Sequence, residues 1–397
     1  MSDKLLLLSA KHSEIPFVQA AKRLGYTVLT TGNKPSLPAH RHADQYVEHD
    51  YSDYDGLAEV ARDLGVTAIC QGCNDFTALA ASAIGERLGF KGHDPYDVAR
   101  VIHRKDDFKR YANNKGIRTP MSTVFESADD AASFGDRMEG RFIVKPVDLA
   151  GGAGVSVVET PDEYAQALDE VSKWSNSSQL IVEPYIDGPL RSLTTFLVDG
   201  SVAGYGSAND YSYLNKYLTN SGSFPADDID SHIDGLIEQV ETIADDLDLV
   251  DGLFHLQYIV DNDGMPWIIE AMRRSPGNYY LDALSRSTGV DWMEWILKAK
   301  AGEDVSGFPS VRPSEHYHAY HSVMAPRNGY LKEIKIDAGL DPYLVNYVEW
   351  LHQGDLIQDY MNDKISNLQL EFPDVDTMRR HMTRINDSTR IDTRMPD

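Results

Sequence analysis

Phe142-Ile-Val-Lys-Pro-Val-Asp-Leu-Ala-Gly-Gly-Ala-Gly-Val-Ser-Val-Val158 is the stretch that decides the fold of this 397-residue chain. An apolar run ends at Lys145, a glycine-rich turn follows, and a second, β-branched run closes the stretch. Gly151, Gly152 and Gly154 have no Cβ, so the backbone can adopt positive φ and turn its N–H groups toward an anion, while Lys145 adds a positive charge. A Walker loop has the opposite order, with the lysine after the glycines. The pattern predicts a phosphate-binding β-hairpin, with a plain glycine-tipped hairpin as the alternative.

Length and charge narrow the classes of function. A chain of 397 residues is long enough for two to four packed units. Its 62 acidic and 37 basic residues give a net charge of −25, which disfavours nucleic acid and anionic membranes as partners. Only four leucines follow the charged pair near the start, too few for a signal or membrane segment, so we expect a cytoplasmic protein. Cys70 and Cys73 lack the partners of a zinc site, and a redox or metal role for them stays an alternative.

Strand and helix patterns alternate through the first ninety or so residues. Strands are expected at Leu5–Leu8, Thr27–Thr30 and Thr67–Cys70, and helices at Ile15–Leu24, Tyr54–Leu64 and Phe76–Leu88. Such alternation builds a parallel sheet covered on both faces, with ligands at the carboxyl ends of its strands. Ser9–His12, Thr31–Asn33 and Gly72–Asp75 would line that crevice. The first turn lacks Gly-x-Gly-x-x-Gly, so we expect a small substrate there and no dinucleotide.

The remaining three hundred residues predict mixed α/β and α+β units. One charged helix with mostly solvated cations is expected at Asp94–Lys115, and the pairs Asp199-Gly200 and Asp263-Gly264 indicate two hairpins. Further helices are expected at Pro161–Trp174, Ile229–Leu247 and Asp374–Arg384, and strands at Leu180–Glu183, Val345–Leu351, Leu356–Ile357 and Leu368–Phe372. We therefore divide the chain into a parallel-sheet domain at 1–92, a linker helix and lid lobe at 93–190, a metal and substrate lobe at 191–305, and a small α+β cap at 306–397.

Four elements follow one another in an order that is informative as a whole. They are Lys105, Lys145 with its glycine turn, Val182-Glu-Pro-Tyr185, and Gln257 with Glu270 on neighbouring expected strands. In this order they resemble the ATP-grasp superfamily of carboxylate–amine (or thiol) ligases. The resemblance covers the first three hundred residues. It implies an ATP-grasp fold that is preceded by a Rossmann-like domain and followed by a cap, with ATP and Mg²⁺ as cofactors.

The resemblance implies phosphate contacts for two lysines. Lys105 would reach the α-phosphate, and Lys145 would reach the α- and β-phosphates from the strand under the glycine turn. A solvated surface charge is the alternative for Lys105. Lys145 lies inside an apolar run, where an ammonium group is costly unless an anion binds it. We therefore count Lys145 as both a nucleotide-binding and a catalytic residue.

The same resemblance identifies a hinge for the adenine. Backbone groups of Pro184 and Tyr185 would meet the edge of the base, and the Glu183 carboxylate would meet its exocyclic amine. Leu190 stands where the family usually has a glutamate for the ribose hydroxyls, and Asp187 is the nearest substitute.

The implied metal ligands are Gln257 and Glu270. Mg²⁺ prefers oxygen donors and often takes only one or two from protein, with the rest from phosphates and water. The family phrase Glu-x-Asn-x-Arg reads Glu270-Ala-Met-Arg-Arg274 here, so Met272 replaces the third donor while Arg274 keeps the catalytic arginine position. Arg273 adds a second charge that could receive a substrate carboxylate.

Three more residues are substrate candidates. Arg191 and Lys216 are predicted to shape the pocket, with packing of the tyrosine-rich loop as the alternative. His255 precedes Gln257 by two residues and so shares its face of a strand, where it would contact an acyl phosphate or fill the sheet. His316, His318 and His321 have a zinc-like spacing without a cysteine nearby, and we keep metal binding there only as an alternative.

The resemblance implies a reaction. A carboxylate would attack the γ-phosphorus of ATP to give an acyl phosphate, and an amine would then displace phosphate to form an amide or peptide-like bond on a small metabolite. Bicarbonate as the activated acid, and a nucleotide-binding module without turnover, are the two alternatives. A homodimer is also expected for this kind of enzyme.

Overall fold

The parallel sheet expected at the N-terminus is present. The computed structural model describes residues 3–149, 152, 154–174, 177–312 and 314–394. Strands β1 (Lys4–Leu8), β2 (Thr27–Gly32), β3 (Gln45–Glu48) and β4 (Ala68–Cys70) are parallel, in the order β3-β2-β1-β4. Leu5 and Leu7 pack on the face covered by α1 (Ile15–Arg23), and Leu6 and Leu8 on the face of α2 (Tyr54–Asp63) and α3 (Asp75–Leu88). The alternation of side chains along β1 thus accounts for the helix layer on each side.

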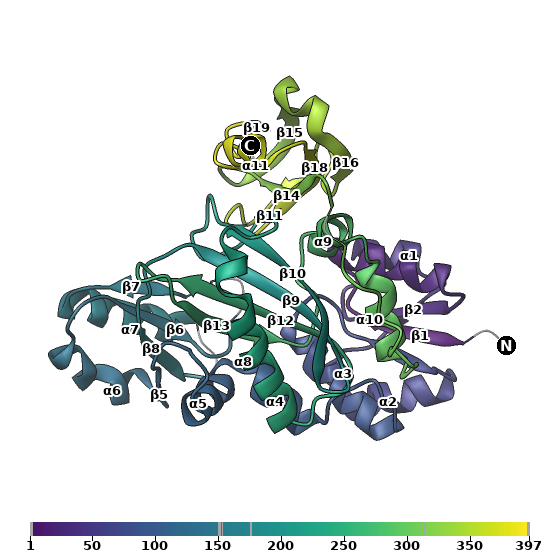
Figure 1. The fold of residues 1–397 in the computed structure, drawn as a ribbon, viewed down its shortest axis with the longest axis horizontal. Coiled ribbons are helices and arrows are strands. Elements are labelled where there is room, and N and C mark those ends of the chain that lie inside the picture. The colour runs from purple at the N-terminus through teal and green to yellow at the C-terminus, as the bar shows by residue number, and fades with distance from the viewer. Residues whose placement is uncertain (1–2, 150–151, 153, 175–176, 313, 395–397) are drawn as a thin grey trace.

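Two helices from late in the chain complete this domain. Helices α9 (Tyr280–Thr288) and α10 (Trp292–Lys300) lie next to α1 in Figure 1. Trp292 and Ile296 share one buried core with Leu5 and Leu7 and with Phe196 of the central sheet. The N-terminal domain and the central sheet therefore have a common core, which fixes the crevice at the ends of the parallel strands against the rest of the molecule.

The central sheet has eight antiparallel strands. Their order is β13 (Pro266–Met272), β12 (Gly252–Val260), β9 (Leu190–Val198), β10 (Ser201–Tyr211), β11 (Ser221–Phe224), β14 (Tyr317–Met324), β18 (Lys364–Phe372) and β16 (Leu344–Glu349). The two Asp-Gly pairs form the turns β9–β10 and β12–β13, as predicted. A 3₁₀ turn at Ile229–Ser231 and helix α8 (Ile233–Asp246) occupy the predicted long helix, and α8 covers one face of the sheet.

The C-terminal segment continues this sheet. Strand β14 pairs with β11, β18 with β14, and β16 with β18. The central sheet therefore contains strands from both sides of residue 305, where the metal and substrate lobe was predicted to end and the cap to begin. A second, three-stranded sheet of β17 (Leu356–Ile357), β15 (Gly329–Ile336) and β19 (Thr389–Arg394) lies with helix α11 (Val375–Met382) at the top of Figure 1. We use the name cap for residues 317–394.

A small lobe carries the glycine hairpin. Strands β5 (Thr123–Phe125), β8 (Leu180–Pro184), β6 (Phe142–Pro146) and β7 (Ser156–Val158) form an antiparallel sheet with α6 (Ala128–Ala131) and α7 (Pro161–Trp174). Ile143 pairs with Val157 in the predicted hairpin. Gly152 and Gly154 have φ of +76° and +70°, and Gly151 lies outside the described residues. A Cβ on Gly152 would come within 2.3 Å of the Tyr217 Cβ, so only glycine fits where the hairpin meets the loop after β10.

The charged helix expected at Asp94–Lys115 is two helices, which corrects the prediction. Helices α4 (Tyr96–His103) and α5 (Lys105–Lys115) are separated by Arg104 in an extended conformation. Arg100 and His103 end α4, and Asp106 and Asp107 begin α5, so each charge suits the dipole of its helix terminus. The break makes Lys105 the first residue of a helix.

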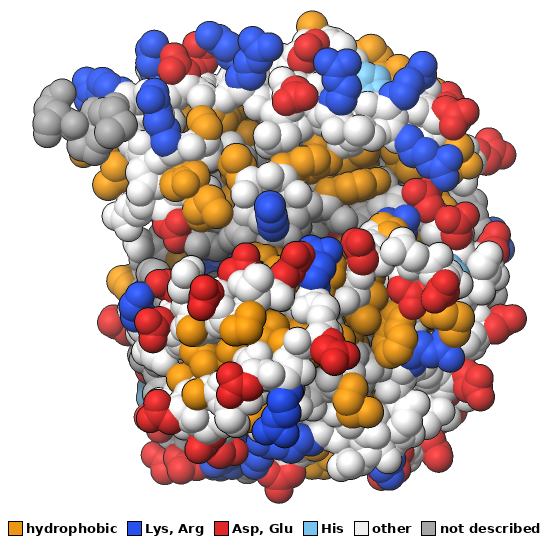
Figure 2. All heavy atoms as spheres, turned by 90° about the vertical axis from the view of Figure 1, so that its left-hand side faces the viewer, with side chains coloured by type: hydrophobic (Ala, Val, Ile, Leu, Met, Phe, Trp, Pro, Cys, Tyr) orange, Lys and Arg blue, Asp and Glu red, His pale blue; other side chains and the backbone are white. Residues whose placement is uncertain are grey.

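The surface agrees with the dispersed charge of the sequence. Acidic and basic side chains are interspersed over the face on the side of α7, which is hollowed across its middle (Figure 2). Within the described ranges, no helix is both long and apolar enough to cross a membrane.

Candidate active site

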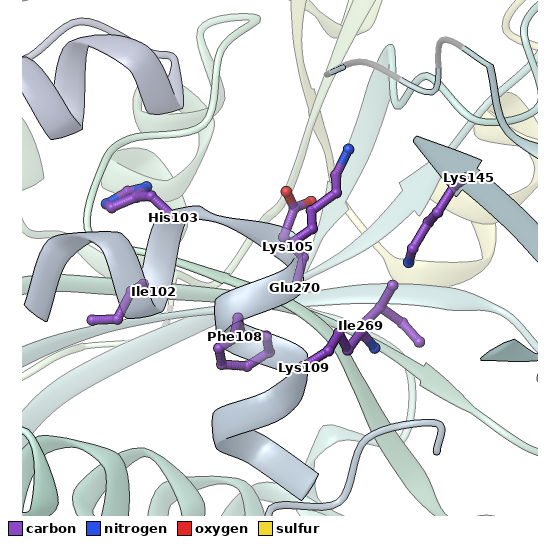
Figure 3. A pocket seen from close by; sticks show the side chains of 8 residues that line it. All are labelled: Ile102, His103, Lys105, Phe108, Lys109, Lys145, Ile269 and Glu270. Atoms are coloured by element: carbon purple, nitrogen blue, oxygen red, sulfur yellow. The ribbon is translucent and has the colours of Figure 1, made fainter. Parts of the chain in front are cut away.

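A small cavity opens where α4, α5, β6 and β13 meet. Its lining residues are Ile102, His103, Lys105, Phe108, Lys109, Lys145, Ile269 and Glu270. In Figure 3 the two lysines of α5, Lys145 of β6 and Glu270 of β13 surround it from three sides. Lys105, Lys145 and Glu270, which are far apart in the sequence, therefore line one space.

A buried carboxylate holds two of these lysines. Glu183 is 3% exposed, and its two oxygens lie 2.5 Å from Lys145 Nζ and 3.1 Å from Lys109 Nζ. Lys109 also donates to Thr119 Oγ1 at 2.7 Å, and Ser122 Oγ donates to Glu183 at 2.9 Å. The triad Lys109–Glu183–Lys145 ties α5 to the small lobe.

Lys109 is the residue that the sequence interpretation missed. It was grouped with solvated cations, yet it is only 2% exposed, which corrects that interpretation. Its position four residues after Lys105 was the available signal, because residues i and i+4 share one face of a helix. Lys105 Nζ itself donates to the Leu149 carbonyl oxygen in the hairpin.

Electrostatics make the cavity suitable for an anion. Burial raises the pKa of Glu183, but Lys109 and Lys145 outweigh burial and hold that pKa at about 2. Burial lowers the pKa of Lys109 to about 8, against the attraction of Glu183. Burial also lowers the pKa of Lys105, which Glu270 opposes. Three lysines face two glutamates here, so a phosphate chain would relieve an excess of positive charge.

The predicted adenine hinge follows β8. The Tyr185 N–H donates to the Arg141 carbonyl oxygen at 2.9 Å, and the Arg141 guanidinium lies 4.0 Å from the centre of the Tyr185 ring. Asp187 is exposed, 3.9 Å from Arg141. Pro184 pairs with Phe142 in the small sheet. Because the Tyr185 N–H already has this partner, other backbone groups of the hinge would have to contact adenine. Adenine binding at the hinge stays a prediction.

The two predicted metal ligands lie opposite each other. Gln257 of β12 and Glu270 of β13 are register partners. Gln257 Nε2 donates to Asp210 Oδ2 at 2.8 Å, which leaves the amide oxygen free for a cation. In the part of the chain that the structure describes, no Lys or Arg nitrogen lies within 4.0 Å of Glu270. No group of three or more His, Cys, Asp or Glu suited to a metal is found there either. Magnesium would take two protein oxygens here and the rest from phosphate and water.

The neighbouring arginines point to different partners. Arg274 makes two 2.9 Å hydrogen bonds to Asp75, which also accepts from His103 Nδ1 at 2.8 Å. Arg273 is 3% exposed, with Asp94 at 2.9 Å and the Leu253 carbonyl oxygen at 2.7 Å. Arg274 thus joins the crevice of the parallel sheet to the end of β13, whereas Arg273 is fully engaged inside the protein.

The remaining substrate candidates are spread over the central sheet. His255 is 2% exposed, with its Nδ1 2.8 Å from Thr194 Oγ1, and burial lowers its pKa to about 3, so the ring is neutral. Arg191 lies 3.7 Å from Asp227, and the next residue of its strand, Ser192, is the register partner of Gln257. Strand alternation therefore sets Arg191 on the opposite face from the predicted metal ligands. Lys216 is exposed on the loop after β10. Their substrate roles stay predictions.

The cysteine and histidine alternatives lack a metal geometry. Cys70 and Cys73 are both free, and burial raises the pKa of Cys70 to about 12, which disfavours the reactive thiolate. His316 contacts Glu371 at 2.6 Å, and His321 contacts Ser221 and Thr389 at 2.6 and 3.1 Å. His318 contacts Ser314 at 3.1 Å. His318 also lies 3.9 Å from Glu371, so it shares that carboxylate with His316, whereas His321 contacts other groups.

Comparison with known proteins supports the sequence resemblance. Residues 104–220 match the family described as phosphoribosylglycinamide synthetase, ATP-grasp (A) domain. The large chain of carbamoyl phosphate synthase from Ralstonia nicotianae is 21% identical over 257 residues, which cover 62% of this chain. This chain spans only 23% of the length of that relative.

Two solved structures cover nearly the whole chain. L-amino acid ligase from Bacillus licheniformis has a TM-score of 0.82 at 18% identity and covers 99% of this chain and 100% of its own. The biotin carboxylase domain dimer of 2-oxoglutarate carboxylase from Hydrogenobacter thermophilus, solved with MgADP, ADP and bicarbonate, has a TM-score of 0.79 at 18% identity and covers 99% of this chain and 91% of its own. The predicted multidomain ATP-grasp fold is confirmed.

Proposed function

We propose that this chain, a member of the ATP-grasp superfamily, is an ATP-dependent carboxylate–amine ligase that acts through an acyl phosphate. The observation that carries the proposal is the convergence of Lys105, Lys145 and Glu270 on one cavity. The products would be ADP, phosphate and an amide or peptide-like bond on a small metabolite.

The cavity residues would act by binding and orienting the reactants. Lys105 and Lys145 would hold the phosphate chain, and the Glu183 carboxylate keeps the Lys145 ammonium fixed at 2.5 Å. A carboxylate oxygen of the substrate would attack the γ-phosphorus while its bond to ADP breaks. The amine nitrogen would then attack the acyl carbon and release phosphate. Arg274 would stabilise the charge that develops at these steps.

Magnesium fits the donor set at the end of β12 and β13. Gln257 and Glu270 would hold it, and when bound it would neutralise phosphate charge. The hairpin would exclude water from the acyl phosphate, since Lys105 already contacts the Leu149 carbonyl oxygen at its base. Gly152, packed against Tyr217, would let it close over the phosphates.

Three finer parts belong to the same proposal. A homodimer is proposed, with the biotin carboxylase domain dimer as the supporting neighbour. A cytoplasmic location is proposed as well. Bicarbonate is the second candidate for the activated acid, because that same neighbour is described in complex with bicarbonate.

Phosphate release tests the function directly. The purified chain would be incubated with ATP and Mg²⁺ against pooled carboxylic acids and amino acids, with bicarbonate in a separate series. Release that requires both an acid and an amine, with ADP formed, is the expected result. Release with bicarbonate alone would favour the second candidate, and ATP binding without release in any pool would favour the nucleotide-binding module.

Matched variants assign the activity to the cavity. Lys145→Met and Glu270→Gln are each expected to reduce ATP turnover at least about a hundredfold. Lys173→Met is the control, because Lys173 is a lysine of the same lobe whose side chain is 64% exposed and pairs with the exposed Glu170. Full turnover in both cavity variants would contradict the site.

A further inference from the structure

A second cationic site lies at the carboxyl end of β1, away from the lysine cavity. Lys364 of the cap is partly buried there, and its Nζ donates to Asn278 Oδ1 at 2.5 Å. Across the described ranges, no carboxylate oxygen lies within 4.0 Å of Lys364 or of Lys11. Burial, reinforced by repulsion from Lys11, lowers the pKa of Lys364 to about 8. Lys11 is exposed and is attracted by the Glu14 carboxylate, so the cost falls on the more enclosed Lys364, whose ammonium group is expensive to bury unless an anion binds it.

Aromatic rings flank these lysines. The rings of His12 and Trp350 stack at 5.2 Å, and the Tyr279 ring lies 5.8 Å from that of Trp350. Trp350 is 7% exposed, and its side chain hydrogen-bonds that of Tyr279. Because His12 follows Lys11 in the chain, its stacking on Trp350 holds the turn after β1 against the cap that carries Lys364.

The backbone here is held in a strained conformation. Asn278 and Tyr279 have φ of +64° and +59°, which is unusual for asparagine and costly for tyrosine. The cap maintains it: Asn367 donates to the Asn278 carbonyl oxygen at 3.0 Å, and Gln369 to that of Tyr279 at 3.4 Å. Strain of this kind persists where surrounding contacts fix a binding surface.

The crevice is connected to the proposed catalytic centre. Asn278 follows Arg274 by four residues, a span of at most about 14 Å. The Asn278 N–H donates to Ser13 Oγ at 3.2 Å, and Arg274 binds Asp75 at the start of α3, so both ends of this segment are fixed to the N-terminal domain. A small metabolite bound beside Lys364 could thus extend toward Arg274.

We propose that Lys364, Lys11 and Trp350 form a subsite for the anionic group of a substrate, either a carboxylate or a phosphate ester. Two parts of the chain build the subsite: the turn after β1 supplies Lys11, and the cap supplies Lys364 and Trp350. That the anion belongs to a substrate rests on the proposed ligase function. Binding of the anion itself does not depend on that function and is tested without ATP.

Chemical labelling of the full chain tests the subsite. Peptide mass spectrometry measures the rate at which an amine-acylating reagent modifies Lys364, whose pKa of about 8 leaves a large share of its amine neutral at pH 8. Inorganic phosphate and acetate are added in separate arms, with chloride as the ionic-strength control. We expect phosphate or acetate, and not chloride, to slow labelling of Lys364, and the more effective ion identifies the chemistry.

An internal control and two variants complete the experiment. Lys335, exposed on the same cap and paired with Glu333, should show no selective protection. In Lys364→Met the thermal shift produced by the protecting ion should be lost, whereas Lys335→Met should retain it. Lys364→Gln keeps a donor for Asn278, so its failure to bind would separate loss of charge from loss of that hydrogen bond.

Two outcomes would overturn the inference. One is protection of Lys364 no greater than that of Lys335 in every arm. The other is a ligase whose KM for acid and amine changes less than about tenfold in Lys364→Met, since a charge-assisted hydrogen bond is worth more than that. Selective protection without ligase activity in any pool would instead leave the subsite standing and remove the proposed function.

Discussion

Glu183→Gln should destabilise the small lobe strongly, because it removes the negative charge that lies between two buried ammonium groups. The pKa of Glu183 falls from an ordinary 4.5 to about 2. Each pKa unit corresponds to about 1.4 kcal/mol, so the folded chain favours the ionised carboxylate by about 3 kcal/mol. Removing one partner of a buried pair costs about 3–5 kcal/mol. The two routes agree, and we expect a loss of that size.

The pH dependence gives the prediction a sign. The folded pKa of Glu183 is depressed, so the stabilisation is complete above 4.5 and is lost as the pH falls toward 2. The glutamine variant has no group that titrates at this position. The difference in unfolding free energy between the two proteins should therefore shrink across that interval.

Hydrogen exchange is the suitable assay, since a multidomain chain need not unfold in one step. The opening free energy would be compared for peptides from β6 and β8 in the wild type and the variant. Glu159→Gln is the matched control in the same lobe, because Glu159 pairs with Arg141 at 2.7 Å while both side chains are about half exposed (58% and 42%). The control should change stability by less than about 1 kcal/mol. A Glu183→Gln effect no larger than the control would refute the reasoning.

Three further substitutions test other features of the structure: an ion pair, a buried carboxyl group and a close backbone contact. Asp75→Asn should lower the free energy of unfolding by about 3–5 kcal/mol in a urea titration, because Arg274 and His103 both depend on this carboxylate; an unchanged midpoint would contradict it. Burial raises the pKa of Asp210 from 3.8 to about 6, so the free energy of unfolding of the wild type should fall by about 3 kcal/mol as the pH rises through that interval. In urea titrations at a series of pH values, Asp210→Asn should lack this fall. Gly152→Ala should raise the KM for ATP, because its Cβ would meet Tyr217, while Gly25→Ala, with φ of +91° and nothing within 4 Å, should leave it unchanged. Equal KM values in the two alanine variants would show that the hairpin does not depend on this contact.

The sequence predicted those parts of the site that local order encodes. Lys145 was expected at the site because its strand and its glycine turn are contiguous, and Glu270 because it follows an apolar run; both line the cavity, while their roles stay predictions. Lys109 was missed, because its partner Glu183 is 74 residues away and only its spacing of four residues from Lys105 separates it from the exposed Arg110 of the same helix. The charged residues near Arg104 hid the helix break for a similar reason, because the helix pattern continues through it.

The cap shows where such reasoning ends. Strand β14 has both faces buried and carries three polar residues, His318, His321 and Ser322, inside the protein. A half-exposed strand is recognised by the alternation of apolar and polar residues. A strand that is buried on both faces and has polar side chains in the interior lacks that alternation. Only the pairing of β14 with β11 reveals that the cap extends the central sheet. That extension carries β18, and with it Lys364, to Asn278. An anion subsite shared by the two ends of the chain could therefore be found only after the sheet order was known.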